Sequence, residues 1–316
     1  MGKYYDQCAE EWNKFIYSSV NGTFLFDRKY MKNGEHKFID FSSVIYDNKD
    51  NLVCVFPANT IDNDVWSHQG LTYGGLIYKN NLKTPEFMKI FDLVISKLKL
   101  WNVKKLIYKP VPYIYRNEPC ESDLYALYKF NAKLINRDIS TVINLKNNTF
   151  IDYSERKQRN ILKAKKYNFE IKSTNISWTM WLMLEKSLLE RHDTKPTHTW
   201  EQIIYLSDNF PNNIATHSIL IDKELYGAII MYYTGNVGHI QYVISSEKAR
   251  ENHAIDFLID WLIQKYKTSA LLGYCKYFDF GISNERNPNK LNEGLITFKE
   301  EFGGTSICYD TYQIDM

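Results

Sequence analysis

Glycine and cysteine are scarce in this sequence of 316 residues, which contains 14 glycines and 5 cysteines. The cysteines are odd in number and widely spaced, and no Cys-x-x-Cys pair occurs among them (Cys8, Cys54, Cys120, Cys275 and Cys308). This pattern argues against a disulfide framework and favours reduced thiols in a cytoplasm. Because no cysteine and histidine lie at the spacing of zinc ligands, we expect no metal site.

Long apolar runs are also absent. No run approaches the roughly 20 apolar residues that a membrane-spanning helix needs. The first residues, Met-Gly-Lys-Tyr-Tyr-Asp, lack the apolar stretch of a secretory signal. Asp6 stands where a myristoylation signal has Ser or Thr. We therefore expect a cytoplasmic protein without membrane insertion.

A strong excess of one charge is missing as well, because the formal net charge is +2. This balance argues against a general nucleic-acid binder that works by bulk charge. The chain is 44% hydrophobic and 24% charged, so it can bury a core and stay soluble. Tyrosine is abundant, with 24 residues. Its flat ring and hydroxyl suit contacts with sugars or bases, and equally the packing of half-buried strands.

One stretch, residues 225–266, organises the second half of the chain. It predicts a strand at 225–233, a turn at Thr234-Gly235-Asn236 and a second strand at 237–244, followed by a polar loop and an amphipathic helix from Ala254. The unpaired backbone N–H groups at such a helix start can bind an anionic group such as a phosphate. An ordinary hairpin packed on an ordinary helix explains the pattern equally well.

The remaining chain alternates helical and extended patterns. Strands are predicted at 38–46, 52–59, 104–108, 133–145, 169–172, 214–221, 274–280 and 306–314, and helices around 12–19 and at 84–98, 122–130, 154–166, 178–191, 199 onward and 291–302. The helix at 84 is expected to have Thr84 as its N-cap and Pro85 at its first position. We expect the turn residues at 47–51 to join the first two strands into a hairpin.

The helix predicted at 154–166 is strongly basic. It contains Arg156, Lys157, Arg159, Lys163, Lys165 and Lys166. Such a run is typical of a solvated face, and it also suits contacts with the phosphates of a nucleotide or RNA. The halves on either side of this helix repeat a similar order of elements. We therefore predict a duplicated α/β unit, with domains at 1–150 and 151–316 and the basic helix as the connector.

Four segments carry a family resemblance. They are Ser67-His68-Gln69-Gly70-Leu71-Thr72-Tyr73-Gly74-Gly75, Lys195-Pro196-Thr197-His198, Asp279-Phe280-Gly281-Ile282-Ser283 and Phe298-Lys299-Glu300-Glu301-Phe302-Gly303-Gly304. Because these four segments occur in this order, the chain resembles the FemAB-like branch of the GNAT acyltransferases. The resemblance is in particular to two-domain proteins associated with bacterial surface-polysaccharide synthesis. The resemblance implies an α/β (α+β) fold of tandem GNAT-like domains, each with a mixed, mostly antiparallel sheet flanked by helices.

The resemblance implies transfer of an acyl group to an amine, with acyl-coenzyme A as co-substrate. The donor would lie between the strands at 237–244 and 274–280. Its expected contacts are Tyr242, Val243, Ile244, Ser245, Arg250, Asn252, His253 and Ala254. The chain departs from the family's phosphate-binding pattern here, because residues 250–254 contain no glycine and include Glu251.

The acceptor implied by the resemblance is an amino sugar on a nucleoside diphosphate, such as a dTDP-amino-dideoxyhexose for O-antigen, lipopolysaccharide or capsule. Its expected contacts are Tyr73, Arg191, His192, His198, Gln241, Asn284 and Glu285. We expect no nucleic-acid partner and a monomer or homodimer. The alternative is an aminoacyl-tRNA-dependent FemAB-type peptidoglycan peptide ligase, although the long helical hairpin frequent in that group is absent. A binding or scaffolding protein with an inactive GNAT fold is a third hypothesis.

Direct transfer needs a base for the amine proton and donors for the developing oxyanion, for which we favour the backbone N–H groups of 242–244. The candidate bases are His68, Asp279 and His217. His68 titrates near neutral pH in unperturbed form, but it could instead fix the glycine-rich turn. Asp279 is flanked by apolar residues and could instead cap the turn at Gly281. His217 lies on a strand and also fits a core histidine.

Overall fold

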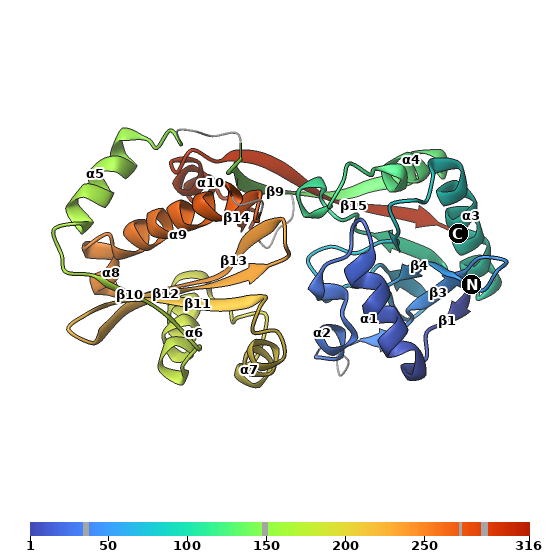
Figure 1. Cartoon of the computed structure of the whole chain (residues 1–316), viewed down its shortest axis with the longest axis horizontal. Coiled ribbons are helices and arrows are strands. Elements are labelled where there is room, and N and C mark those ends of the chain that lie inside the picture. Colours follow the sequence, from blue (N-terminus) through green and yellow to red (C-terminus); the bar gives the residue numbers. More distant parts are fainter. Residues whose placement is uncertain (34–37, 147–150, 272–273, 286–289) are drawn as a thin grey trace. The chain divides into compact units, whose positions relative to one another are not determined.

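The computed structural model describes residues 1–33, 38–146, 151–271, 274–285 and 290–316, except for the side chain of His192. The chain forms two compact units (Figure 1). Unit 1 contains Met1–Asp138 and Cys308–Met316, and unit 2 contains Ile139–Glu285 and Leu291–Ile307. The predicted domains placed the division after residue 150. In the structure it lies within strand β9 (Lys133–Asn144), and strand β15 (Thr305–Asp315) leads the chain back to unit 1.

Unit 1 has two groups of strands. One is an antiparallel sheet of β1 (Gly2–Lys3), β3 (Ser43–Tyr46), β4 (Leu52–Phe56) and β7 (Ile77–Tyr78), in that order. The other follows the order β15, β8 (Lys105–Tyr108), β6 (Asp64–Trp66), β5 (Asn59–Ile61) and β2 (Ile39–Asp40). Strands β6 and β8 are parallel. The helices of this unit are α1 (Ala9–Ser18), α2 (Arg28–Lys32), α3 (Thr84–Leu100) and α4 (Ser122–Lys129), with short 3-10 turns at Asp6–Cys8, Phe24–Phe26 and Tyr113–Tyr115.

The long first hairpin predicted from the sequence is divided between these two sheets. Residues 38–46 form β2 and β3, and residues 52–59 form β4 and the start of β5. The Asp40 carboxylate accepts a hydrogen bond from the Ser42 backbone N–H at 3.0 Å, which bends the chain between β2 and β3. Pro57 separates β4 from β5, as expected for a residue that cannot donate to a strand ladder.

Helix α3 provides much of the core of unit 1. Its residues Phe87, Phe91 and Leu98 recur at helical spacing and are buried in one apolar cluster with residues of β4, β7 and β8. The N-cap of this helix is Lys83, one residue before the predicted N-cap Thr84. The Glu86 carboxylate accepts a hydrogen bond from the Lys83 backbone N–H at 3.1 Å and satisfies one group at the helix start.

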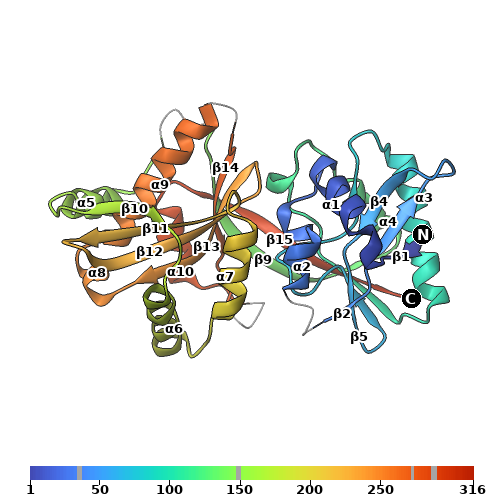
Figure 2. The ribbon, with the colours of Figure 1, turned by 60° about the horizontal axis from the view of Figure 1, so that its bottom comes forward.

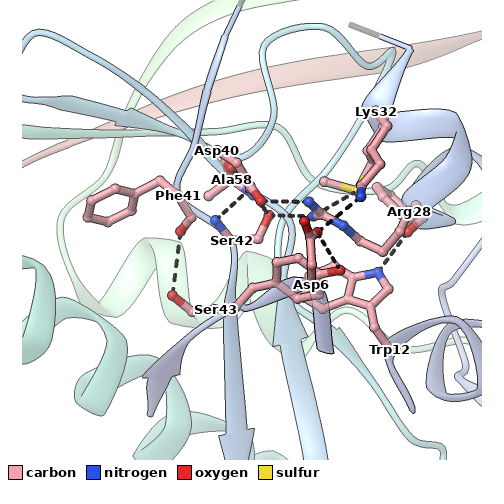
Figure 3. A network of polar contacts seen from close by, with 12 residues as sticks. Asp6, Trp12, Arg28, Lys32, Asp40, Phe41, Ser42, Ser43 and Ala58 are labelled. Carbon is pink, nitrogen blue, oxygen red and sulfur yellow. Dashed lines mark hydrogen bonds and ion pairs between the residues drawn. The ribbon is translucent and has the colours of Figure 1, made fainter. Parts of the chain in front are cut away.

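A buried arginine ties α2 to β2 in unit 1 (Figure 3). Arg28 lies 2.6 Å from the Asp40 carboxylate and 3.2 Å from the Ser42 hydroxyl. Its guanidinium lies over the Tyr4 ring, 3.8 Å from the ring centroid. Nearby, the Trp12 indole N–H donates to the Phe26 carbonyl at 2.8 Å. Because the charge is both paired and covered by aromatic rings, it can be buried at low cost.

Unit 2 is built on one sheet with the strand order β10 (Glu170–Thr174), β11 (Ile214–Ile221), β12 (Glu224–Tyr233), β13 (Val237–Ser245), β14 (Tyr277–Ile282) and β9. Strands β13 and β14 are parallel, and the other pairs are antiparallel. Helices α5 (Glu155–Ala164) and α9 (Ala254–Leu271) lie on one side of β10–β13, and α6 (Trp178–His192) and α7 (Trp200–Asn209) lie on the other (Figures 1 and 2). Helix α10 (Glu293–Glu300) completes the unit.

The structure confirms the predicted hairpin and helix of residues 225–266, as β12, β13 and α9. The predicted polar loop between β13 and α9 contains a short helix instead, α8 (Glu247–Glu251). The Ser246 hydroxyl caps it by accepting from the Ala249 backbone N–H at 3.1 Å. The core of this unit packs α9 against β12 through residues such as Leu258, Leu262 and Ile229.

Helix α5, the basic helix of the sequence analysis, belongs to unit 2 and packs on α9. It is not simply a solvated face, because Lys157 is buried. Among the described residues, no helix is long and apolar enough to cross a membrane. The same residues contain no cluster of three or more His, Cys, Asp and Glu side chains that could hold a metal ion.

Candidate active site

The parallel strands β13 and β14 separate after a short contact. Their paired residues are Val237 with Tyr277, Gly238 with Phe278 and His239 with Asp279. Beyond His239, this edge of β13 has no strand partner in the part of the chain that the structure describes. Backbone N–H and C=O groups on that edge are therefore available to a ligand, as expected where parallel strands diverge in a sheet.

A histidine and a buried aspartate face each other where the two strands separate. The Nδ1 atom of His239 lies 2.7 Å from Oδ2 of Asp279. The other carboxylate oxygen, Oδ1, accepts hydrogen bonds from the Ser140 hydroxyl at 2.5 Å and the Gly281 backbone N–H at 2.9 Å. The Asp279 side chain is 0% exposed, whereas that of His239 is 14% exposed. His239 is therefore the member of this pair that a ligand can contact.

Gly281 is required by the shape of this region. Its φ of +78° lies in the left-handed range that favours glycine, and a Cβ there would lie 3.2 Å from Cε1 of His239. A buried ammonium group holds the same bend, because Lys299 Nζ donates to the carbonyls of Gly281 and Ile282, both at 2.7 Å. Burial lowers the pKa of Lys299 to about 8. The end of β14 is thus fixed by polar contacts on both sides.

A pocket of about 700 Å³ lies at the far end of β13. Its polar lining consists of Arg156, Lys157, Asn160, Ser187, Arg191, Ser245, Arg250, His253, Asp256 and Asn292. Its apolar lining consists of Leu184, Leu188, Val243, Ala249, Ile255, Leu295 and Phe298, and Gly294 also contributes. Such a pocket suits a ligand that combines an anionic group with a flat or apolar body.

The charged side chains of the pocket differ in exposure, with a buried ion pair and exposed arginines. Lys157 is buried, lies 2.9 Å from Asp256 and sits over the Phe298 ring at 3.9 Å from its centroid. Burial lowers the pKa of Lys157, and the Asp256 carboxylate opposes this effect. Arg156, Arg191 and Arg250 are exposed, and Arg156 is paired with Glu301 at 2.6 Å. An incoming anion can therefore reach Arg191 and Arg250 without competing with that ion pair. The acid noted in the sequence, Glu251, is exposed and does not line the pocket.

The structure brings five of the predicted ligand-binding residues together in this pocket: Arg191, Val243, Ser245, Arg250 and His253. Two more meet beside β13, where His198 Nδ1 lies 2.7 Å from the Tyr242 hydroxyl. Gln241 lies at the bulge in the β12–β13 ladder. Ile244 and Ala254 are buried, and Asn252 caps the end of α8.

Other predicted residues of unit 2 lie outside the pocket lining. Asn284 accepts a hydrogen bond from the Ile139 backbone N–H at 2.8 Å, which is a structural contact. Glu285 is exposed. The side chain of His192 lies outside the described residues. His217 is buried, with its Nδ1 atom 2.9 Å from the Ser173 hydroxyl.

Two predicted residues, His68 and Tyr73, belong to unit 1. His68 is 7% exposed and has a φ of +64°. Burial lowers the pKa of His68 to about 4. Tyr73 is 2% exposed and packs against Tyr115, with ring centroids 4.5 Å apart. In this structure both side chains are packed as core residues.

Sequence reasoning gave His239 and Ser140 no role, quoted Lys299 only within the segment Phe298–Gly304, and named Lys157 only among the basic residues of its helix. His239 could have been noted from its place in the alternating pattern of β13. The pocket face of α5 has a helical signal, because Lys157 and Ile161 are both buried and lie four residues apart. Ser140 and Lys299 had no local signal, since their partners lie 139 and 16–18 residues away.

Solved structures with a similar fold cover the whole chain. FemX aligns with a TM-score of 0.71 and 11% identity over 100% of this chain and 98% of its own. The L-PGS of Bacillus licheniformis aligns with a TM-score of 0.60 and 11% identity over 99% of this chain and 92% of its own. The C-terminal domain of a putative lysylphosphatidylglycerol synthetase from Agrobacterium fabrum aligns with a TM-score of 0.59 and 9% identity over 97% and 90%.

No family model and no curated protein sequence matches the chain. The structural similarity therefore establishes the fold, which is the tandem GNAT-like α/β fold of FemAB-like proteins predicted from the sequence. In the part of the chain that the structure describes, both units contain a parallel strand pair, β6–β8 in unit 1 and β13–β14 in unit 2. The chain thus has an acyltransferase-like fold with a candidate active site on β13 and β14 of unit 2.

Proposed function

We propose that this protein is an aminoacyltransferase of the FemAB type. It would move an aminoacyl group from an aminoacyl-tRNA to an amine of a peptidoglycan precursor peptide. The observation that carries this proposal is the agreement with FemX, a peptidoglycan peptide ligase, over 100% of this chain and 98% of that one. The proposal therefore favours the alternative of the sequence analysis over the amino-sugar acyltransferase.

The pocket at the end of β13 suits the 3′-terminal nucleotide of such a donor. Two of its exposed cations, Arg191 and Arg250, can pair with a phosphate. Its apolar wall, including Val243 and Leu295, offers a surface for a base. Val243 lies four residues beyond His239, which corresponds to about 13 Å of extended strand. A nucleotide in the pocket could therefore direct its esterified 3′ end along β13 toward the point where β13 and β14 separate.

The sequence offered two arguments against a tRNA donor, the low net charge and the lack of a long helical hairpin. Neither argument excludes such a donor. The net charge of +2 describes the whole chain, whereas the pocket gathers Arg156, Lys157, Arg191 and Arg250 in one place. The absence of a long helical hairpin does not separate this chain from FemX, because the alignment leaves almost none of either chain uncovered.

The second candidate is transfer from acyl-coenzyme A to a nucleotide-linked amino sugar. The observation that favours it is the set of four segments that resemble polysaccharide-associated proteins, of which Asp279–Ser283 and Phe298–Gly304 lie beside the candidate site. In this case the pyrophosphate would meet Arg250 and His253, and the acyl chain would follow the same edge of β13. A dTDP-amino sugar for O-antigen or capsule would be the acceptor.

One assay separates the candidates. The purified protein is incubated with tRNA charged with each of several radiolabelled amino acids, or with acetyl-CoA and longer acyl-CoAs. Each donor is paired with a peptidoglycan precursor peptide, a panel of dTDP- and UDP-amino sugars, and phosphatidylglycerol vesicles. Products are identified by mass spectrometry.

RNase-sensitive transfer of the amino acid to the peptide is the result expected from the proposal. Thiol release with an amino sugar would replace it with the second candidate. Lysyl or other aminoacyl transfer to phosphatidylglycerol would keep the tRNA donor but change the acceptor to the one named for the two synthetase structures. Absence of transfer with every pair would contradict both candidates and favour a binding protein.

A further inference from the structure

The contacts of His239 define its orientation. The Nδ1 atom faces the Asp279 carboxylate at 2.7 Å, so in the neutral ring this nitrogen carries the proton that the carboxylate accepts. The other ring nitrogen, Nε2, then has the lone pair. This is the arrangement in which an imidazole can accept a proton from a substrate.

Asp279 is held so that it cannot take the place of the histidine. Its two oxygens receive hydrogen bonds from the Ser140 hydroxyl, the Gly281 N–H and the His239 ring. It is 0% exposed, and β14 lies between β13 and β9, which provide His239 and Ser140 to the carboxylate. A fully bonded, buried carboxylate orients an imidazole and stabilises its charged form, but it does not contact substrate.

We propose that His239 is the general base of the acyl transfer and that Asp279 and Ser140 are positioning residues. The assignment of a role rests on the proposed function, whereas the arrangement of the side chains stands on their contacts alone. The residue that takes the amine proton is thus His239 and not Asp279, which the sequence had suggested. The location supports this role, because His239 is the last paired residue of β13 before the strands separate.

The step balances with the groups named. The nitrogen of the acceptor amine attacks the carbonyl carbon of the aminoacyl ester, and His239 Nε2 takes one proton from that amine. The C–N bond forms and the ester C–O bond breaks. The imidazolium then returns the proton to the departing 3′ oxygen of the nucleotide. With a thioester donor, the C–S bond breaks and the sulfur receives the proton.

Among the described residues, groups of β14 and β12 lie beside the His239 ring, and α10 contacts the end of β14. Asp279 on β14 faces Nδ1, and Lys299 on α10 donates to the carbonyl of Gly281. Tyr232 lies opposite His239 on β12. The Asp279 carboxylate is the acidic group that meets the ring at hydrogen-bond distance, so it is placed to accept the Nδ1 proton.

The first test does not depend on activity. The protein is labelled with ¹⁵N-histidine, and the His239 ring is assigned by comparison with the His239→Gln variant. Long-range ¹H–¹⁵N correlation should show the neutral ring protonated at Nδ1. In Asp279→Asn this preference should be lost. A neutral ring protonated at Nε2 in the unmodified protein would overturn the inference, whatever reaction the protein catalyses.

The second test uses the donor and acceptor pair found active in the assay above. His239→Gln should lower kcat by at least about 100-fold, as expected for loss of a general base, and should leave the donor KM within about threefold. Asp279→Asn and Ser140→Ala should lower kcat less, again with little change in KM. Imidazole added to His239→Ala should restore part of the rate in a saturable way.

A kcat for His239→Gln within about threefold of the unmodified protein would overturn the inference while leaving the proposed function intact. Thermal denaturation of each variant identifies changes due to misfolding. If no donor and acceptor pair reacts, the proposed function fails, and the ring tautomer alone decides whether the histidine is oriented as stated.

Discussion

Lys157 of α5 and Asp256 of α9 form a buried ion pair at 2.9 Å in the wall of the pocket. The Asp256 carboxylate also accepts from the Asn160 side chain at 3.0 Å. The pair therefore joins the basic helix to the core helix of unit 2 and shapes the pocket at the same time.

Breaking this pair should destabilise unit 2. Lys157→Met leaves a buried carboxylate without its cation, which costs about 3–5 kcal/mol of unfolding free energy. Urea denaturation followed by tryptophan fluorescence measures the change. The matched control is Arg159→Ala, which removes an exposed pair with Glu155 on the same helix and should cost less than about 0.5 kcal/mol. Similar losses in the two variants would show that the buried pair has no special role.

Alanine substitutions at two glycines with positive φ can separate the effect of backbone strain from the effect of contact with His239. Gly281 and Gly235 have φ values of +78° and +88°, but only at Gly281 would a Cβ approach the His239 ring. Alanine at either position should lower the free energy of unfolding by about 1 kcal/mol through backbone strain. Only Gly281→Ala should also shift the His239 ring resonances and lower kcat. Unchanged resonances in Gly281→Ala would contradict the close packing of ring and backbone.

Stability should fall at acidic pH because of His68. Burial lowers the pKa of His68 to about 4 from its ordinary value of 6.5, so the unfolded chain binds a proton between these values when the folded chain does not. The contribution of His68 to the unfolding free energy is therefore fully present above pH 6.5 and falls by about 3 kcal/mol as the pH drops to 4. His217, whose pKa is also lowered to about 4 by burial, acts in the same direction.

The variant His68→Asn tests this assignment, because asparagine tolerates the left-handed backbone at this position. Urea denaturation at several pH values between 4 and 7 should give a shallower dependence on pH than in the unmodified protein. An identical dependence in both proteins would show that His68 does not titrate as described.

The exposed cations of the pocket should control donor affinity. Arg250→Ala and Arg191→Ala are each expected to raise the donor KM about tenfold, since an arginine–phosphate contact is worth about 1.5–3 kcal/mol. The effect should shrink as salt is added. Arg159→Ala is the control, because Arg159 is a basic residue of α5 that does not line the pocket. Equal changes in all three variants would indicate general electrostatic attraction instead of a defined site.

The local patterns of the chain determined much of the fold. Alternating apolar residues correctly predicted β12 and β13, and the turn at Gly235 between them needs only local chemistry. The order of elements in the two halves predicted a duplicated α/β unit, and the resemblance of four short segments implied the tandem GNAT-like fold. These features depend on residues within a few positions of one another, so they are readable before any tertiary contact is known.

Only the tertiary structure decided the candidate site. His239 and Asp279 lie 40 residues apart, and Ser140 lies 139 residues from Asp279. Lys157 reaches Asp256 across 99 residues. Which polar side chains meet depends on how strands pair and helices pack across these distances, and this long-range pairing leaves no periodic signal in the sequence. The sequence identified Asp279 as chemically unusual, and the pairing of β13 with β14 placed His239 against it.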